Sequence, residues 1–335
     1  MRVLKPARAS EHLRPEICEI RNAAIVYNPT SGRSRSRRLH AIENAARILR
    51  EAGIDAGLLP TTCAGSATEL ARDAVRRGCE MIVACGGDGT INEIVNGIAG
   101  TQTPLAVLPA GTANILAKEL GIPWNIPAAA RLIAKGKHVR VALGAATWRQ
   151  NGSRAVGGPT VPTERYFLCV AGAGPDGAIV HGVDTAHKLR VGMLAYWLEG
   201  FRQFLTYPFP HFRVASPEKE LPASLIVVGR TKHYGGPFRI TTGASLFEDQ
   251  FEIVAYAGRS RLMLMLCLPA VWLGWLHLMR GIHVWKTAQL TCVPAAECEI
   301  FSQLDGEPSS ALPIEFRIVP DALTLVVPTN SKSDV

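Results

Sequence analysis

The sequence predicts an α/β domain built on a parallel sheet, followed by an all-β, sandwich-like domain. In the first part, short apolar segments each run into a polar loop rich in Gly, Ser or Thr, and each loop leads into a helical segment. This repeat is typical of parallel sheets. In the second part the alternation gives way to short strands, and 335 residues suffice for two domains. We therefore expect an N-terminal extension at 1–20, the α/β domain at 21–138, the β-rich domain at 139–328 and a tail at 329–335.

Composition and charge narrow the class of protein. Hydrophobic residues make up 47% of the chain and charged residues 19%, which favours a packed core over disorder. The net charge is +8, and residues 1–50 hold 11 Lys and Arg against 4 Glu and no Asp, which suggests an anionic partner. Phosphate, nucleic acid and an acidic membrane all qualify on charge. Nucleic-acid binders interleave aromatic residues with the basic ones, whereas Tyr27 stands alone in this segment, so we expect no nucleic-acid partner.

The cysteines and the N-terminus indicate the compartment. The eight cysteines form no C-x-x-C pair and no zinc-ligand spacing, which is typical of reduced core residues. The first twenty residues lack the apolar stretch of a signal peptide. We therefore expect a cytoplasmic protein.

The first strand, Ala23–Tyr27, ends in a loop of small and hydroxyl-bearing residues. The loop is Asn28, Pro29, Thr30, Ser31 and Gly32, followed by basic residues. This is a candidate phosphate loop. The basic residues admit a second interpretation, a solvated face of the helix expected at 37–52. A second strand at 56–59 then leads into another such loop at Thr61.

The central strand, Met81–Cys85, runs into the most informative loop of the chain. The loop and the helix start comprise Gly86, Gly87, Asp88, Gly89, Thr90, Ile91 and Asn92. Glycines let several backbone N–H groups point at one anion, and the helix that we expect from Thr90 adds its positive dipole end. Asp88 would repel a phosphate directly, so it suggests a bridging Mg²⁺ or a bond to a nucleotide hydroxyl or a loop amide. A tight turn with a capping Asp and no ligand is the alternative.

A fourth strand, Leu105–Pro109, ends in a loop that contains Thr112. In an open parallel sheet all such loops meet at the carboxyl edge, where these folds bind ligands. Together the four loops predict a nucleotide site.

In the second part, two helical segments interrupt the strands. Residues 189–205 carry an apolar stripe typical of core packing. Residues 262–279 are apolar except for His277, with Trp272 and Trp275 near one end. Their 18 residues meet the minimum for a membrane span. A single pass there would put the final strands across the bilayer from the nucleotide loops, so core packing and a pocket at the membrane surface remain the two alternatives.

The motifs in this order resemble the diacylglycerol kinase catalytic-domain family, which includes bacterial lipid kinases and the sphingosine and ceramide kinases. They are the loop from Asn28 to Gly32, the loop from Gly86 to Glu93, the segment Pro109–Asn114 and the triplet Asp305-Gly306-Glu307. The resemblance implies an NAD-kinase-like α/β domain and a β-sandwich, with ATP in the cleft between them. It also implies that ATP binds at Asn28 to Gly32, Thr61, Gly86 to Asn92 and Thr112. Asp305 and Glu307 match the catalytic acidic pair, and Mg²⁺ accompanies ATP.

One departure from the family concerns a structural Mg²⁺ site in the second domain. Family members often carry an Asp-Gly pair there, where this chain has Glu248 and Asp249. The resemblance then implies a ligand set of the Glu248 carboxylate and the carbonyl oxygens of Ser245 and Gln250.

The resulting expectation is an ATP-dependent lipid kinase that contacts the membrane peripherally and phosphorylates diacylglycerol to phosphatidic acid. A sphingoid base or ceramide is the nearest alternative acceptor. An NAD kinase shares the central loop but offers no reason for the apolar segment 262–279. A non-catalytic lipid- or nucleotide-binding protein would not require Asp88, Asp305 and Glu307.

Overall fold

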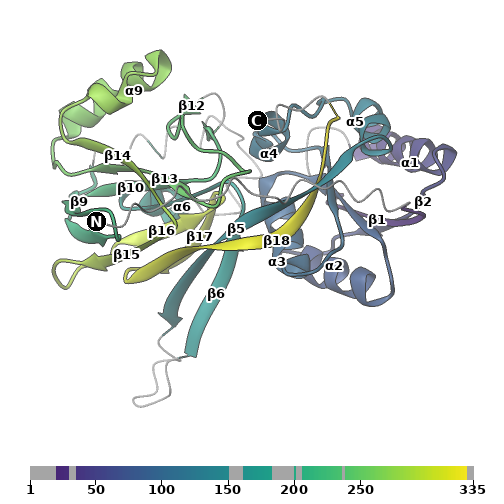
Figure 1. The fold of residues 1–335 in the computed structure, drawn as a ribbon, viewed down its shortest axis with the longest axis horizontal. Helices are drawn as coiled ribbons and strands as arrows, with labels where there is room; N and C mark the ends of the chain where they lie inside the picture. The colour runs from purple at the N-terminus through teal and green to yellow at the C-terminus, as the bar shows by residue number, and fades with distance from the viewer. Residues whose placement is uncertain are drawn as a thin grey trace, which may run out of the picture.

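The computed structural model contains two lobes that share a long pair of strands (Figure 1). One lobe carries α1 to α5, and the other carries two packed β layers with α6 and α9 at their edges. The residues that the structure describes are 20–29, 35–150, 161–182, 200, 206–235 and 238–329. The helix expected at 189–205 falls outside them except for one residue.

The first lobe is a parallel sheet covered by helices on both faces. Its strands lie in the order β2-β1-β3-β4. Every residue of β3 and β4 is buried, because α1 and α5 cover one face and α2 and α3 the other (Figure 1). The bounds of the strands are β1 Asn22–Tyr27, β2 Asp55–Pro60, β3 Met81–Gly86 and β4 Leu105–Pro109. The bounds of the helices are α1 Arg35–Glu51, α2 Ser66–Arg76, α3 Asp88–Ile98, α4 Ile115–Glu119 and α5 Ile126–Ile133.

Two long antiparallel strands, β5 (Lys137–Gln150) and β18 (Ile314–Val327), join the lobes. The end of β18 pairs in parallel with β4, where Leu325 lies opposite Leu105. One sheet therefore continues from the first lobe into the second. From its short apolar segments the sequence predicts separate strands at 314–318 and 323–327. The structure has one strand there, whose register shifts between Val319 and Leu323. A bulge bends such a strand without ending it.

The second lobe is a β-sandwich, as the sequence predicts. Its second sheet has the order β14-β13-β10-β7-β16-β17 and packs on the continuation of the first sheet. Phe167 lies in the core between the layers, stacked on Phe251 at 5.6 Å and edge-on to Phe316 at 6.0 Å. The strands of this sheet are β7 Val170–Ala173, β10 Leu225–Gly229, β13 Phe251–Tyr256, β14 Ile282–Thr287, β16 Phe301–Leu304 and β17 Glu307–Ala311. The remaining strands are β6 Val161–Phe167, β8 Phe212–Ala215, β9 Glu220–Ala223, β11 His233–Tyr234, β12 Phe238–Arg239 and β15 Gln289–Pro294.

The apolar segment at 262–279 forms a helix shorter than its composition suggests. Helix α9 runs from Arg261 to Leu273. Its N-cap is Ser260, whose hydroxyl accepts the Met263 N–H, and its C-cap is Gly274, which is in the left-handed conformation. A 3-10 turn, η1 (Leu276–Leu278), follows. Within the described part of the chain, no helix has the length and apolarity needed to cross a bilayer.

Candidate functional site

Loops of the first lobe lie side by side at the carboxyl edge of its sheet. Backbone hydrogen bonds continue the strand pairing beyond the strands: Asn28 N donates to Cys85 O at 3.2 Å, and Thr61 N to Tyr27 O at 2.8 Å. The structure thus places Asn28 and Pro29 beside the end of β3, where the central loop begins, and Thr61 beside the end of β1. Thr30, Ser31 and Gly32 belong to the same predicted site but lie outside the described residues.

The central loop packs tightly against the loop after β4. A Cβ on Gly111 would lie 2.4 Å from the Gly87 Cα, and a Cβ on Gly86 would lie 2.6 Å from the Thr90 Cβ. Both positions therefore require glycine. Helix α3 begins at Asp88, two residues earlier than the sequence predicts, and among the described residues no side chain caps it at Gly87. Uncapped N–H groups at a helix start suit the binding of phosphate.

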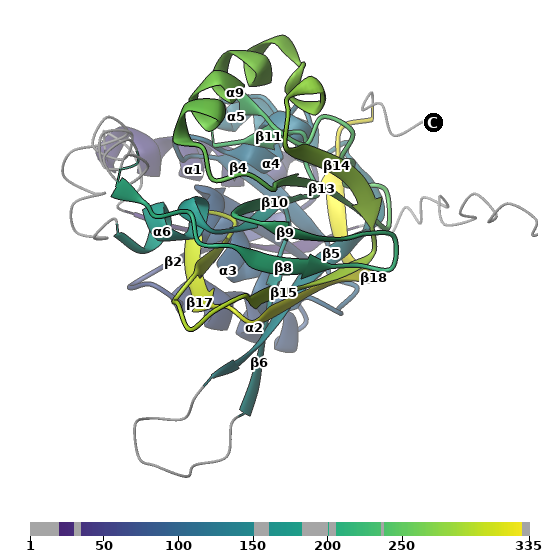
Figure 2. The same ribbon diagram turned by 90° about the vertical axis from the view of Figure 1, so that its left-hand side faces the viewer.

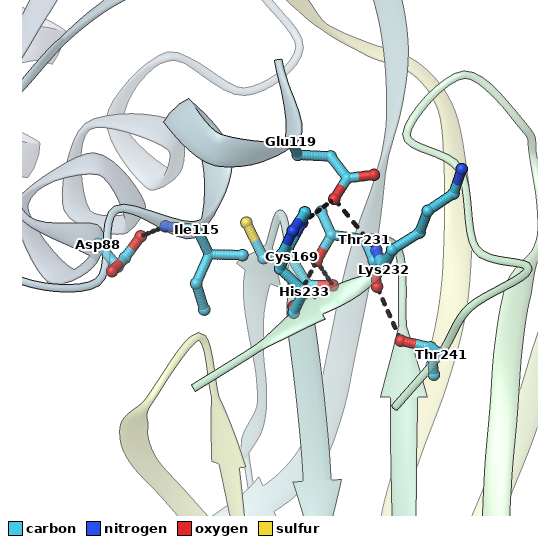
Figure 3. Close-up of polar contacts among 8 residues, drawn as sticks. All are labelled: Asp88, Ile115, Glu119, Cys169, Thr231, Lys232, His233 and Thr241. Carbon is cyan, nitrogen blue, oxygen red and sulfur yellow. Dashed lines mark hydrogen bonds and ion pairs between the residues drawn. The ribbon is translucent and has the colours of Figure 1, made fainter. Parts of the chain in front are cut away.

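Asp88 connects the central loop to the first turn of α4. Its Oδ1 accepts the Ile115 N–H at 2.7 Å (Figure 3). This contact is the loop-amide bond among the alternatives that the sequence leaves open. Burial raises the pKa of Asp88 to about 6, the Ile115 N–H opposes the shift, and the nearby Asp305 adds to it. A carboxyl with a pKa in this range, at a cleft, is typical of functional sites.

The raised pKa of Asp88 predicts a pH-dependent stability. Between pH 4 and pH 6 the folded protein holds a proton that the unfolded chain has released, so folding becomes less favourable as pH rises through this window. For nucleotide-free protein, we expect the free energy of unfolding of wild type, relative to Asp88→Asn, to fall by up to about 3 kcal/mol from pH 4 to pH 7. Urea unfolding of both proteins across this range measures it. Parallel curves would show that Asp88 titrates normally.

The acidic triplet forms a two-residue hairpin turn between β16 and β17. Asp305 has φ of 50° and Gly306 φ of 80°, and Leu304 lies opposite Glu307 in the ladder. Tight hairpins favour turns with positive φ at both central positions, which Asp and Gly tolerate. The turn aims both carboxylates at the first lobe.

The carboxylate of Asp305 is held by four N–H donors. Its Oδ1 accepts the N–H groups of Cys169 at 2.8 Å and Val170 at 2.9 Å. Its Oδ2 accepts the Leu168 N–H and the side-chain amide of Asn92, both at 2.8 Å. Because Asn92 belongs to α3, Asp305 ties the two lobes together beside the central loop.

Glu307 has different surroundings. It is half-buried, and its Oε1 lies 2.9 Å from the position that a Cβ on Gly89 would take. In the part of the chain that the structure describes, no donor contacts its carboxylate. A small cavity close by is lined by Asp88, Asp305 and apolar residues of both lobes. The site therefore combines two carboxylates: that of Asp305, which already accepts four hydrogen bonds, and that of Glu307, which is available to contact a ligand.

Sequence reasoning missed two residues at this junction, Asn96 and Arg165. Asn96 exchanges hydrogen bonds with the backbone of Tyr166, and the Arg165 guanidinium donates to Asn92 Oδ1 at 2.9 Å. Arg165 also reaches the carbonyl oxygen of Pro308, next to Glu307, at 3.4 Å. The spacing of Asn92 and Asn96, one helical turn apart, was the available signal. Nothing local marks Arg165.

A second bridge between the lobes runs from α4 to the β11–β12 hairpin (Figure 3). Glu119 Oε2 accepts from His233 Nδ1 at 2.8 Å and from the Lys232 N–H at 3.2 Å. This contact and the one at Asp305 hold the lobes on both sides of the cavity.

A buried carboxylate, Asp176 in α6 (Pro175–Gly182), supports the acidic turn. It accepts from the Tyr234 hydroxyl and, at 2.9 Å, from the Gln303 side-chain amide. Gln303 Oε1 in turn accepts the Gly306 N–H at 2.7 Å. Burial raises the pKa of Asp176. The sequence analysis did not single out this residue.

The three residues of the expected structural metal site make contacts with other groups. The Glu248 carboxylate bonds Lys286 Nζ at 2.5 Å, and the Ser245 carbonyl oxygen accepts the Glu248 N–H at 3.2 Å. The carbonyl oxygen of Gln250 faces the guanidinium of Arg230 at 3.4 Å. The three residues predicted as metal ligands thus have other partners in the structure.

Comparison with known proteins agrees with this architecture. Residues 22–146 match the diacylglycerol kinase catalytic domain, and residues 169–327 match the YegS C-terminal NAD kinase beta sandwich-like domain. The chain is 30% identical over 310 residues to a diacylglycerol kinase of Bacillus subtilis (strain 168), covering 89% of this chain and 93% of that one. It is 28% identical over 316 residues to a diacylglycerol kinase of Mycobacterium tuberculosis, covering 92% and 96%.

A solved structure of a diacylglycerol kinase from Bacillus anthracis str. Sterne shares the fold. The TM-score is 0.71 at 22% identity, covering 93% of this chain and 99% of that one. The fold and the sequence matches extend over both lobes. The chain therefore belongs to the diacylglycerol kinase family, and it is a lipid kinase.

Proposed function

We propose that this kinase transfers the γ-phosphoryl group of ATP to the hydroxyl of diacylglycerol and produces phosphatidic acid. The observation that carries the proposal is the meeting of two features across the cleft. The uncapped start of α3 suits a phosphate, and the Asp305–Glu307 turn faces it with carboxylates. Because the chain belongs to this family of lipid kinases, we do not retain the alternative functions of an NAD kinase and of a non-catalytic binding protein.

The nucleotide-binding loops are those at the carboxyl edge of the parallel sheet. In this proposal Asn28, Pro29, Thr61, Thr112 and the segment Gly86–Asn92 line the ATP site, together with Thr30, Ser31 and Gly32 of the first loop. Mg²⁺ bound with ATP offsets the phosphate charge. Asp88 is the carboxylate of the central loop that would face this ion, and oxygen donors suit it.

We assign different roles to the two acidic residues of the turn. A lipid hydroxyl loses its proton as its oxygen attacks the phosphoryl group, so a nearby carboxylate must accept that proton. Asp305 already accepts four N–H groups, so both of its oxygens are engaged and neither faces an acceptor hydroxyl. Glu307 is available and lies beside Gly89. Glu307 is therefore the general base, and Asp305 positions the turn.

A kinase assay tests the proposal directly. Purified protein is incubated with labelled ATP, Mg²⁺ and mixed micelles that contain diacylglycerol, a sphingoid base or ceramide in separate reactions. The expected product is phosphatidic acid, with at most traces from the other acceptors. Preferential labelling of the sphingoid base or of ceramide would move the substrate to that class.

We also propose that the α9–η1 surface, residues 261–278, contacts the membrane. Large apolar side chains protrude from it, and two of the most exposed are Trp272 at 68% and Leu278 at 71%. The others are Leu262, Met265, Leu266, Leu273 and Trp275. The sequence has no Asp or Glu between Glu252 and Glu297. An exposed apolar patch without negative charge suits an anionic bilayer surface.

The position of this surface favours delivery of a lipid to the cleft. Trp272 packs edge-on against Phe238 of β12 at 5.9 Å. The paired strand β11 carries His233, which contacts α4 across the cleft. Figure 2 shows α9 above β11, on the same side of the molecule as α4. A bilayer in contact with the exposed face of α9 would thus lie close to the entrance of the site.

Replacing both exposed tryptophans should weaken membrane binding. Trp272→Ala with Trp275→Ala removes two interfacial side chains, so we expect at least a fivefold loss of co-sedimentation with anionic vesicles, and a parallel loss of activity on vesicle-embedded diacylglycerol. Activity on a short-chain soluble acceptor should persist. Trp124→Ala, at a site 50% exposed on the other lobe, is the matched control. Equal loss on both acceptors would show that the segment is part of the core.

A further inference from the structure

The second lobe contains a fully buried arginine, Arg230, directly after β10. Its Nη2 donates to the carbonyl oxygens of Ala142 at 2.9 Å and Leu246 at 2.8 Å. Its Nη1 donates to those of Glu248 and Gln250, the latter at 3.4 Å. Burial lowers the pKa of Arg230 to about 10, so the guanidinium remains charged at neutral pH. The buried cation is therefore surrounded by backbone carbonyl oxygens.

Three of these four carbonyl groups belong to the loop in which a structural Mg²⁺ is expected; the fourth, that of Ala142, belongs to β5. Leu246, Glu248 and Gln250 lie within the segment 245–250 that the family resemblance assigns to the metal. Carbonyl oxygens are ligands that Mg²⁺ and Ca²⁺ also use, and the Gln250 carbonyl oxygen belongs both to the ligand set that the resemblance implies and to the contacts of Arg230. Two cations a few ångströms apart in a buried site repel each other strongly. The loop accommodates one cation.

The acidic side chains of the loop are not placed to balance the positive charge of a divalent ion. Glu248 is 47% exposed and pairs with Lys286. Asp249 is exposed on the surface. Among the residues that the structure describes, no three His, Cys, Asp or Glu side chains gather as a metal site. Glu252 on β13 is buried, but it accepts the Gly243 N–H at 2.8 Å. Neither Glu248 nor Asp249 is turned inward as the anionic ligand that a divalent cation requires.

We propose that the Arg230 guanidinium takes the place of the structural divalent cation in this chain, so that the second domain folds without a bound metal in this loop. The guanidinium then binds the carbonyl oxygens of the loop, as a bound divalent ion would in other members of the family. Without such a partner these carbonyl groups would lack hydrogen bonds. The only metal requirement that remains is that of the nucleotide.

The position of Arg230 connects this loop to the site. Its backbone N–H donates to Cys169 O at 2.8 Å, and the Cys169 N–H is one of the donors that hold Asp305. The chain then continues through Thr231, whose carbonyl oxygen accepts the Thr241 hydroxyl at 2.7 Å, to His233 and its contact with α4 (Figure 3). Arg230 therefore anchors the segment that crosses the cleft.

Thermal unfolding of the nucleotide-free protein tests the proposal independently of the substrate. The midpoint is measured after treatment with EDTA, and again after addition of millimolar Mg²⁺ or Ca²⁺. We expect the midpoints to agree within about 1 °C, since no structural ion is lost or gained. A fall of several degrees in EDTA that Mg²⁺ reverses would overturn the proposal.

Substitution of Arg230 supplies the second measurement. Arg230→Met leaves four carbonyl oxygens without this donor, and two of the contacts, to Ala142 and Leu246, are buried, so we expect the midpoint to fall by roughly 5 °C or more. Arg149→Met, at an exposed position of β5, should leave it unchanged. If Arg230→Met does not fold, Arg230→Lys replaces it, because an ammonium keeps the charge but lacks the fork that reaches all four oxygens. A variant at position 230 as stable as wild type would contradict the proposal.

Discussion

Glu307→Gln should lower the turnover number by a factor of roughly 10² or more while the protein remains as stable as wild type. The substitution preserves size and shape but removes the group that accepts the proton of the lipid hydroxyl. No described residue donates to the Glu307 carboxylate, so its loss leaves no orphaned partner and the unfolding midpoint should not move. Nucleotide affinity, measured by fluorescence or calorimetry, should also stay within a factor of about two, because the residue acts on the acceptor side.

A neighbouring carboxylate provides the control. Glu315→Gln makes the same chemical change on β18, at an exposed position, and should retain full turnover. If Glu307→Gln remains active, the proton must go elsewhere. Asp88 is then one candidate beside Asp305, because its pKa, raised to about 6, lies closer to neutrality than that of an ordinary carboxyl. A pH profile of kcat/KM for Asp88→Asn would decide between them.

Much of the fold follows from local sequence, and the reason is physical. The strands of the first lobe are continuous apolar segments because both of their faces are buried, and glycine-rich loops mark where they end. The Asp305-Gly306 turn is equally local, since both residues tolerate positive φ. The pairing of β18 with β4 is not local. It joins Leu325 to Leu105, more than two hundred residues apart, and no spacing in the sequence encodes it.

The site itself was only partly predictable for the same reason. The motif residues Asp88, Asn92, Asp305 and Glu307 meet as expected, but what distinguishes their roles is the set of donors around each carboxylate. Those donors are largely backbone N–H groups, which every residue carries and no motif reveals. Arg230 is a further contact that local sequence does not reveal: this arginine, distant in the sequence, donates to the carbonyl oxygens of Leu246 and Glu248 in the loop at 245–250.

Asp305→Asn should reduce both stability and activity, unlike Glu307→Gln. Asparagine offers one acceptor oxygen where aspartate has two, and its amide group would face two N–H donors that cannot bond to it. Leaving buried donors unsatisfied costs about 1–3 kcal/mol each, so we expect a loss of roughly 2–4 kcal/mol in the free energy of unfolding. Turnover should fall at least tenfold, since the turn that carries Glu307 loses its anchor.

A matched control separates this effect from that of the turn conformation. Asp321 also has φ of 50°, but it is exposed, at the bulge of β18. Asparagine tolerates the left-handed region as well as aspartate does, so Asp321→Asn should leave stability and turnover close to wild type. If Asp305→Asn is as stable as Asp321→Asn and yet inactive, Asp305 is itself the proton acceptor. If it loses stability and activity together, while Glu307→Gln loses activity alone, the division of roles between the two carboxylates holds.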